Sequence, residues 1–307
     1  MKKEKTNLAA SVRQRLFNQS RAGDGQDFQR LLVRYAIERL LYRLSQSPVR
    51  TKFVLKGANL FAIWAKAPFR STGDLDFLGF GSSDIDTARK TFADLCELKV
   101  ADDGLAFDSS SIRVETMREE EEYQGLRVRL NAKLGTAVIA VQVDIGFGDT
   151  VHPEPLELVY PPLLDDMPVA KIRAYPPETV IAEKFEAMVR FGEPTSRVKD
   201  HYDLWALSRT FPFDMDVLTV AIAKTFRHRG TEVPTTVPAP LTPAFAADRT
   251  KQSQWAAFLT RTAPSFVPPP FSDVIDEVRA FLEPALSALA SRSVQPNHWI
   301  PNAGWNQ

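Results

Sequence analysis

Two aspartates alternate with two large apolar residues in the segment Asp74-Leu75-Asp76-Phe77. A β-strand turns successive side chains to opposite faces, so this segment predicts a strand with both carboxylates on one face and Leu75 and Phe77 in the core. Two carboxylates held this close repel each other unless a positive charge lies between them. Hard divalent cations prefer such oxygen ligands. The segment therefore predicts a strand that binds Mg²⁺ or Mn²⁺.

A further aspartate, Asp144, interrupts the apolar segment Val141–Ile145, where a charge needs a partner. We predict that Asp144 is the third metal ligand. For Asp144 the alternative is a purely structural role. For Asp74 and Asp76 it is a turn at the end of a strand, in which the carboxylates accept hydrogen bonds from backbone amides.

The composition is that of a globular protein: 44% of the 307 residues are hydrophobic, and 38 basic residues balance 38 acidic ones. A net charge of zero argues against a protein that coats nucleic acid without selectivity. The apolar runs are shorter than the roughly 20 residues of a membrane helix, so no membrane association is expected. No apolar signal-peptide core follows the charged N-terminus, and the single Cys96 allows no internal disulfide. We expect a cytoplasmic protein.

Hydrophobic periodicity predicts a mixed α+β fold in the first half of the chain. A helix over 27–47, which starts near Asp24 or Gly25, precedes a short buried strand and a tight turn at Gly57. A second helix leads back to the Asp74 strand, and the resulting mixed sheet is expected to close on the Asp74 hairpin. The remaining predicted elements are a helix over 84–97 and sheet segments over 111–117, 126–134 and 137–146.

Prolines punctuate the chain after Gly148 and predict a loop-rich connection at a domain boundary. The prediction is a core with N-terminal helices over 1–150, a mostly helical region over 151–291 that completes the active site, and a loose tail over 292–307. The predicted helices of the second region cover 178–191, 200–210, 217–226, 252–262 and 272–291.

Lys184 lies four residues from both Val180 and Met188, and therefore on or beside the apolar stripe of its helix. A lysine there needs an anion, which could be a nucleotide phosphate or the carboxylate of Asp200. The alternative is a surface lysine whose stem packs on the core. Asp200 and Asp203 stand at the start of the next helix, where either could simply cap it.

Lys184, Asp200 and Asp203 form a second candidate cluster, and the basic residues around and after it form a candidate nucleic-acid patch. A solvated helical face is the alternative. The patch comprises Arg190, Arg197, Lys199, Arg209, Lys224, Arg227, His228 and Arg229.

Several catalytic classes can be excluded. The sequence has no Walker phosphate loop, no Gly-x-Gly-x-x-Gly motif and no nucleophile elbow, and its four histidines lack the spacing of a zinc site. Phosphoryl transfer needs clustered carboxylates, a cation for the triphosphate and a backbone turn open to phosphates, and the sequence offers each of these parts. Gly57 and Ala58, between a strand and a helix, could supply that turn.

Four ordered motifs over roughly residues 25–210 resemble the AbiEii/AbiGii nucleotidyltransferase toxins, which include the MenT toxins and lie within the DNA polymerase β-like superfamily. The motifs are Lys56-Gly57-Ala58-x-Leu60, Arg70-x-Thr72-x-Asp74-Leu75-Asp76, Thr179-Val180-Ile181-Ala182-Glu183-Lys184 and Arg197-x-Lys199-Asp200-x-Tyr202-Asp203-Leu204. The resemblance implies a nucleotidyltransferase core with a helical C-terminal region, and a toxin of a bacterial toxin-antitoxin or phage-defence pair.

The resemblance also implies roles for individual residues. Asp74 and Asp76 correspond to the metal-binding pair, Thr72 to the Ser/Thr position before it, and Lys184 to a lysine that meets the nucleotide phosphates. Asp200 corresponds to the downstream catalytic aspartate, with Asp203 the second choice. The nucleotide-binding turn comprises Gly57 and Ala58, with Lys56 before it, and Ala58 replaces a more usual Gly or Ser. Arg70 is expected to pair with a phosphate or with the acidic cluster.

The predicted function is metal-dependent transfer of nucleotides from a nucleoside triphosphate (NTP) to the 3′ end of tRNA, with a cognate antitoxin as partner. The NTP is expected in a cleft between the sheet core and the helical half, and Asp144 is a candidate to activate the attacking hydroxyl. One alternative is a nucleotidyltransferase that modifies a small molecule or a protein hydroxyl. Another is a catalytically silent, partner-binding protein of the same fold.

Overall fold

The computed structural model describes residues 7–22, 27–65, 70, 72–119, 123–291 and 298–306. The chain divides into two compact units, which we call the sheet unit (Met1–Gly148 and Glu157–Ala174) and the helical unit (Asp149–Leu156 and Tyr175–Gln307). The sequence predicted one boundary after residue 150. In the structure the chain returns to the sheet unit over 157–174 before it enters the helical unit for good.

A seven-stranded mixed sheet forms the centre of the sheet unit, with strand order β3-β4-β5-β2-β1-β7-β6. β3, β4 and β5 are antiparallel neighbours, β5 pairs parallel with β2, β2 pairs antiparallel with β1, and β1 pairs parallel with β7. The strands are β1 (Phe53–Lys56), β2 (Asp74–Gly79), β3 (Leu105–Glu119), β4 (Tyr123–Leu134), β5 (Ala137–Phe147), β6 (Leu156–Tyr160) and β7 (Ala170–Ala174).

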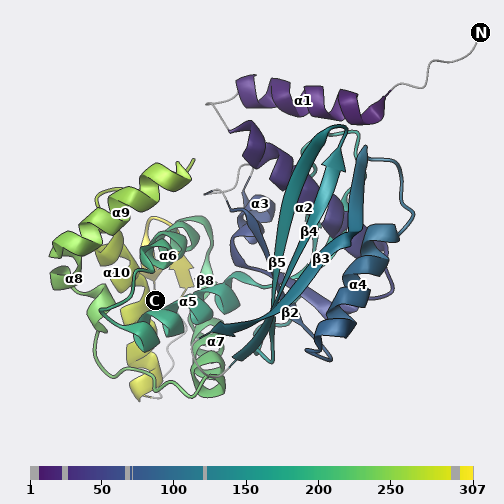
Figure 1. Cartoon of the computed structure of the whole chain (residues 1–307). Helices are drawn as coiled ribbons and strands as arrows, with labels where there is room; N and C mark the ends of the chain where they lie inside the picture. Colours follow the sequence, from purple (N-terminus) through teal and green to yellow (C-terminus); the bar gives the residue numbers. More distant parts are fainter. Residues whose placement is uncertain are drawn as a thin grey trace, which may run out of the picture. The chain divides into compact units, whose positions relative to one another are not determined.

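Helices cover one face of this sheet (Figure 1). α2 (Phe28–Gln46) packs against β5 and β7, α4 (Ile85–Glu97) packs against β3 and β4, and α1 (Leu8–Ala22) lies on α2. Alternate residues of the strands point into this layer and are fully buried, among them Leu75, Val128 and Val143. Many of the intervening residues are polar and partly exposed, among them Asp76, Arg127 and Asp144, so the opposite face of these strands carries charged side chains.

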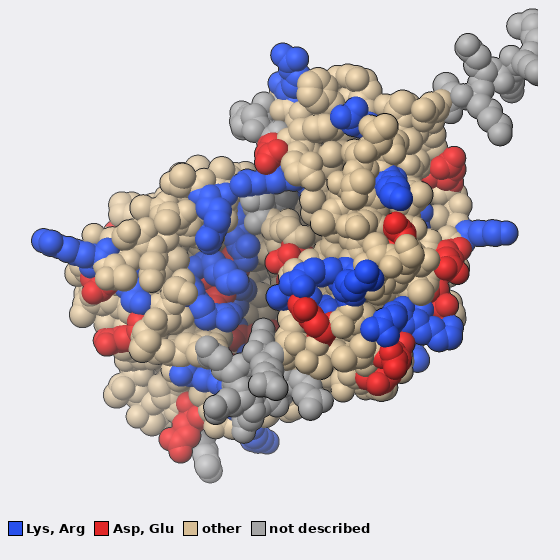
Figure 2. Space-filling model, viewed as in Figure 1, with Lys and Arg blue, Asp and Glu red and all other residues tan. Residues whose placement is uncertain are grey.

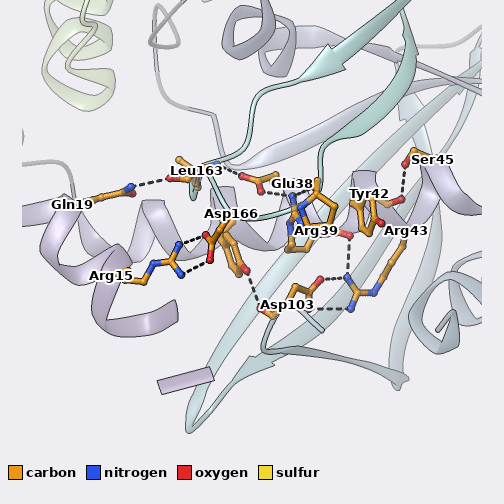
Figure 3. A network of polar contacts seen from close by, with 12 residues as sticks. Arg15, Gln19, Glu38, Arg39, Tyr42, Arg43, Ser45, Asp103, Leu163 and Asp166 are labelled. Carbon is orange, nitrogen blue, oxygen red and sulfur yellow. Dashed lines mark hydrogen bonds and ion pairs between the residues drawn. The ribbon is translucent and has the colours of Figure 1, made fainter. Parts of the chain in front are cut away.

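Buried charges of α2 are neutralised inside the sheet unit (Figure 3). Arg43 forms an ion pair with Asp103 at 2.6 Å, and Arg39 forms one with the neighbouring Glu38. Glu38 also accepts a hydrogen bond from the backbone amide of Leu163 at 2.7 Å. Burial raises the pKa of Glu38, and the Arg39 charge opposes that shift. A buried charge costs several kcal/mol unless it is paired, so these contacts tie α2 to the chain around it.

The mixed α+β fold confirms the predicted class, and the long periodic segments were placed well. α2 and α4 match their predicted ranges within a residue or two. Asp27 caps α2 by accepting from the amide of Gln29, whereas the expected starts at Asp24 and Gly25 lie outside the described residues. The helix after Gly57 is a 3-10 turn (Gly57–Asn59) followed by the short α3 (Leu60–Trp64). β6 and β7 occupy the connection that the sequence predicted to be loop.

The helical unit is built from α5 (Pro177–Phe191), α6 (Val198–Thr210), α7 (Met215–His228), α8 (Pro243–Ala247), α9 (Arg249–Thr262) and α10 (Phe271–Ser291). α5 packs against α6 and α7, and α10 packs against α6, α7 and α8. Phe185 of α5 and Phe226 of α7 meet at 5.4 Å between ring centroids in the core. The helical character of this half therefore agrees with the sequence.

The end of the chain forms strands where the sequence predicted a loose tail over 292–307. β9 (His298–Ile300) pairs with β10 (Gly304–Asn306) and with β8 (Phe213–Asp214) in a three-stranded sheet. Trp299 donates a hydrogen bond to the carbonyl of Ser208 at 2.6 Å, and the Trp305 ring stacks on Phe281. Two tryptophans bury enough apolar surface to hold a short segment in place. Residues 292–297 and 307 lie outside the described residues.

His201 is completely buried in the helical unit, between the rings of Phe245 and Phe271. Its Nε2 lies 2.9 Å from the carbonyl oxygen of Pro240. Burial lowers the pKa of His201 to about 4, so the ring is neutral in the folded protein at neutral pH.

Stability should fall at mildly acidic pH because of His201. In the unfolded chain a histidine has a pKa near 6.5, so between about pH 6.5 and about pH 4 only the unfolded chain binds this proton. The free energy of unfolding should therefore drop by about 1.4 kcal/mol per pH unit in this window. His201→Gln should remove that slope in urea unfolding measured from pH 7.5 to pH 5. A His228→Gln control should keep the wild-type dependence of unfolding free energy on pH. If His201→Gln keeps it as well, this account is contradicted.

Candidate active site

Asp74 and Asp76 lie on the polar face of β2, as the alternation predicted. Asp74 is exposed and Asp76 is half-buried, whereas Leu75 and Phe77 are buried on the other face. The two carboxylates therefore come from one strand and share one side of the sheet.

The pairing of β2 with its neighbours extends this polar face into a row of charged residues. Lys56 of β1 is the register partner of Asp76, and Asp76 is the parallel partner of Asp144 on β5. Arg127 of β4 is in turn the antiparallel partner of Asp144. Residues in register on adjacent strands point to the same face, so four strands contribute one charged side chain each. Asp144, predicted from its position in an apolar strand, thus belongs next to Asp76.

Arg127 grips Asp144 through two hydrogen bonds. Nε donates to Oδ1 at 2.8 Å and an Nη donates to Oδ2 at 2.7 Å. These bonds raise the pKa of Arg127, and Gln142 lies within 3.4 Å of the same carboxylate. A two-bond guanidinium fork is the strongest common way to hold a carboxylate. The charge that Asp144 needs is therefore supplied by Arg127.

The sequence contained a signal for Arg127 that motif analysis missed. A two-residue turn at Gly135 and Thr136 joins β4 to β5, with Leu134 opposite Ala137. Such a short turn fixes the register of the two strands, and pairing outward from it places Arg127 opposite Asp144. The arginine was findable from the hairpin alone.

Gly57 is pressed against Asp76. Its backbone has φ of +72°, and a Cβ at this position would lie 2.1 Å from Oδ2 of Asp76. Only glycine fits both the conformation and the space. The predicted turn at Gly57 therefore exists, and its backbone runs directly past a metal-ligand candidate.

Side chains around the turn fix the start of β2. The buried Asn59 donates from Nδ2 to the carbonyl of Asp74 at 2.6 Å and accepts from the Tyr160 hydroxyl at 3.3 Å. Thr72 lies within 3.4 Å of the same carbonyl, a long contact. Asn59 was not predicted, although a buried amide next to a carboxylate pair is a recognisable signal.

The other predicted turn residues have mixed surroundings. Ala58 is buried, and Lys56 is half-buried. The guanidinium of Arg70 lies 5.8 Å from the ring centroid of Phe61, in the range of a cation–π contact. The expected pairing of Arg70 with a phosphate or with the acidic cluster stays a prediction.

The second predicted cluster lies wholly in the helical unit. Lys184 of α5 contacts Asp200 at 2.8 Å and Asp203 at 2.6 Å, both on α6. Both aspartates are fully buried, and Arg197 donates to the second oxygen of Asp200 at 2.8 Å. The sequence left a phosphate and Asp200 as alternative anions for Lys184. In the structure both Asp200 and Asp203 are ion-pair partners of Lys184.

Electrostatics keep Asp200 ionised despite its burial. Burial alone would raise the pKa of Asp200, but the charges of Lys184 and Arg197 outweigh it and hold the pKa below its ordinary value. Two carboxylates and two cations balance in this cluster. Such a group fastens α6 to α5.

A neighbouring buried cluster was not foreseen. Arg229, at the end of α7, contacts Asp149 at 3.1 Å, Glu183 at 3.3 Å and Glu186 at 2.9 Å. Burial opposes the charge, yet these carboxylates raise the pKa of Arg229 above its usual range. Glu183 and Glu186 stand one turn apart on a buried helix, which is a signal for a missing cation.

Three members of the predicted basic patch form ion pairs with acidic residues. Arg229 belongs to the cluster above, and Arg209 forms an ion pair with Glu277. Arg197 pairs with Asp200, and like Arg190 it also lies 5.5 Å from the ring centroid of Phe191. The patch predicted from sequence is thus smaller than its list of residues.

The described side chains provide only part of a metal-ligand set in their present positions. In the described stretches of the chain, no three His, Cys, Asp or Glu residues meet as a metal-binding group. Both oxygens of Asp144 are held by Arg127. Asp74 and Asp76 fit a hard cation by their chemistry and their shared face, and the cation itself stays a prediction.

A protein-family model matches residues 39–277 and is described as nucleotidyl transferase AbiEii toxin, type IV TA (toxin-antitoxin) system. This span covers well over half of the chain and includes every residue assigned above from the four motifs. The chain belongs to the AbiEii toxin family. It is a nucleotidyl-transferring enzyme, and the family implies an NTP substrate and an antitoxin partner.

Solved structures give a weaker likeness. A candidate nucleotidyltransferase from H. pylori is 14% identical with a TM-score of 0.48, and the match covers 87% of this chain and 99% of that one. JHP933 from Helicobacter pylori is 14% identical with a TM-score of 0.49, and the match covers 86% and 94% of the two chains. Among curated proteins no match was found. None of the helices in the described residues is long and apolar enough to cross a membrane.

Gly57→Ala should damage the site beyond the ordinary cost of a left-handed alanine. Gly135→Ala is the matched control, because Gly135 has φ of +61° with nothing within 4 Å of a Cβ. The control should lose about 1 to 2 kcal/mol of unfolding free energy. Gly57→Ala should lose more and should also lose nucleotidyl transfer, since Asp76 must move. Equal losses of stability, with activity retained in both, would refute the close packing at Gly57.

Lys184→Met should destabilise the helical unit by about 3 kcal/mol or more, because it leaves two buried carboxylates with one cation fewer. Lys224→Met, at an exposed lysine of α7 in the same unit, should change the free energy of unfolding by less than about 1 kcal/mol. Urea unfolding measures both. If the two variants are equally stable, Lys184 does not carry the buried charge balance described here.

Proposed function

We propose that this AbiEii-family enzyme is a divalent-metal-dependent nucleotidyltransferase that transfers nucleotides from an NTP to the 3′ end of tRNA and so blocks translation. The observation that carries the metal and NTP part is the pair Asp74 and Asp76 on the polar face of β2, with the Gly57 turn packed against Asp76. A nucleoside triphosphate and its cation require such a pair of carboxylates next to a backbone turn that the phosphates can approach.

In this proposal each residue of the sheet unit has a separate task. Asp74 and Asp76 hold the cation, with Asp144 as the third ligand. The backbone at Gly57 and Ala58 accommodates the phosphates, because no side chain projects there from Gly57 and amides at a turn favour anions. Asn59 keeps the start of β2 in place through the Asp74 carbonyl. A bound Mg²⁺ or Mn²⁺ would neutralise the charge that develops on the leaving pyrophosphate.

Asp74 and Asp76 are suited to this task because both carboxylates lie on the polar face of one strand. Asp74 is exposed and Asp76 is half-buried, so a ligand can reach them from solvent. Charge neutralisation is effective where the ligand set is preorganised, and one strand with a fixed register provides that.

The roles that the resemblance gives to the helical unit stay predictions. Lys184 would meet the triphosphate and Asp200 would assist catalysis. In these roles Lys184 would have to bind a phosphate while its ammonium group also neutralises Asp200 and Asp203. Lys184→Met therefore also tests NTP affinity.

The tRNA acceptor is proposed from the family resemblance together with local basic groups. Lys199 of α6 and Lys224 and Arg227 of α7 are exposed. Figure 2 shows that Lys and Arg gather in local groups with acidic residues nearby. Local groups of this kind contact phosphates without making the whole protein basic.

Asp74→Asn and Asp76→Asn test the proposal. Each should reduce transfer of radiolabelled nucleotide to purified tRNA by at least about 100-fold, because each removes part of the preorganised charge. Asp94→Asn is the matched control, since Asp94 is an exposed aspartate of the same unit that pairs with Lys90 on α4. Circular dichroism should show an intact fold in all three.

Parallel reactions with total RNA, protein and small-molecule acceptors identify the product. Label at the 3′ end of tRNA that is lost in Asp74→Asn supports the proposal. Label in protein or in a small molecule would show that the enzyme transfers nucleotides to an acceptor other than tRNA. Full activity in Asp74→Asn would show that the site lies elsewhere.

A further inference from the structure

Arg127 contacts Asp144, the residue proposed as the third ligand of the metal site. Its guanidinium contacts both oxygens of Asp144, at 2.8 and 2.7 Å. The side chain of Asp144 is 16% exposed, so the ion pair is partly shielded from water. A partly buried, bidentate ion pair is stronger than a surface pair.

The location of this ion pair in the sheet gives it a specific electrostatic task. Asp144 has Asp76 as its register partner on one side and Arg127 on the other. Two carboxylates on adjacent strands repel each other, and the charge of Arg127 offsets that repulsion. A divalent cation would offset it from the other side.

The neighbouring arginine of β4 does not share this task. Arg129 lies on the same face two residues further along, and it contacts Glu115 at 2.6 Å and Gln142 at 3.3 Å. It carries the same charge as Arg127 but holds different partners. The pairing with Asp144 is thus a property of Arg127, and Arg129 serves as its natural control.

We infer that Arg127 is a positioning residue that competes with the catalytic cation for Asp144. With no cation present, the guanidinium fork turns the Asp144 carboxylate toward β4. Binding of the cation requires one oxygen of Asp144 to leave that fork. This inference rests on the proposed metal dependence, and it adds a residue that sets how readily the ligand set closes.

The test is Mn²⁺ binding in the absence of nucleotide, measured by electron paramagnetic resonance on the full-length protein. Arg127→Gln should bind Mn²⁺ about tenfold more tightly than the wild type, the scale of one partly buried charge-pair contact. Arg129→Gln removes an equal charge from the same face and should change the Kd by less than about twofold. In the double variant Arg127→Gln with Asp144→Asn the gain should disappear.

Arg127→Lys provides a second measurement that does not depend on loss of the charge. A lysine keeps the charge but cannot fork onto both oxygens, so its Mn²⁺ Kd should fall between those of the wild type and Arg127→Gln. Thermal unfolding checks that each variant is folded before it is titrated.

The outcomes separate this inference from the proposed function. If Asp74→Asn abolishes Mn²⁺ binding while Arg127→Gln and Arg127→Lys bind no more tightly than the wild type, the competition is refuted and the metal site stands. If Asp74→Asn binds Mn²⁺ as the wild type does, the metal site itself is refuted. A gain in Arg129→Gln equal to that in Arg127→Gln would reduce the effect to general charge and would also overturn the inference.

Discussion

The parallel pairing of β2 with β5 is the constraint on which the proposed site depends. These strands are distant in sequence, and their register places Asp76 beside Asp144 while Leu75 and Val143 enter the core. A shift of one residue would turn one carboxylate into the apolar layer, which the burial of the alternate residues forbids. The hydrophobic packing of α2 and α4 on the far face therefore also fixes the carboxylates on the near face.

In both units, buried acidic side chains are paired with basic side chains of the same unit. Asp144 is balanced by Arg127, Asp200 and Asp203 by Lys184 and Arg197, and Asp103 by Arg43. An enzyme that binds a polyanionic substrate needs such balance, because an uncompensated acidic site would repel the triphosphate. The cation is proposed at Asp74 and Asp76 because these two carboxylates share the polar face of β2 beside the Gly57 turn.

Much of the fold and part of the site could be predicted from the sequence because the signals are local. The alternation at Asp74–Phe77 and the periodicity of α2 depend only on nearby residues. The parallel partner of β2 depends on a contact between distant segments, so a role for Asp144 could be predicted but its place beside Asp76 could not. β6 and β7 were missed because they are short and flanked by prolines, and the tail because its strands depend on Trp299 and Trp305 packing against distant residues. Arg229, placed in an exposed patch by its neighbours in sequence, is buried by partners from three other positions.

The most direct measurement is a crystal structure of the enzyme soaked with Mn²⁺ and a non-hydrolysable NTP, with anomalous scattering recorded at the manganese edge. The account predicts an anomalous peak between the carboxylates of Asp74 and Asp76, with the triphosphate over the backbone of Gly57 and with Asp144 turned away from Arg127. A peak at other residues, or a triphosphate bound without contact to β2, would contradict it.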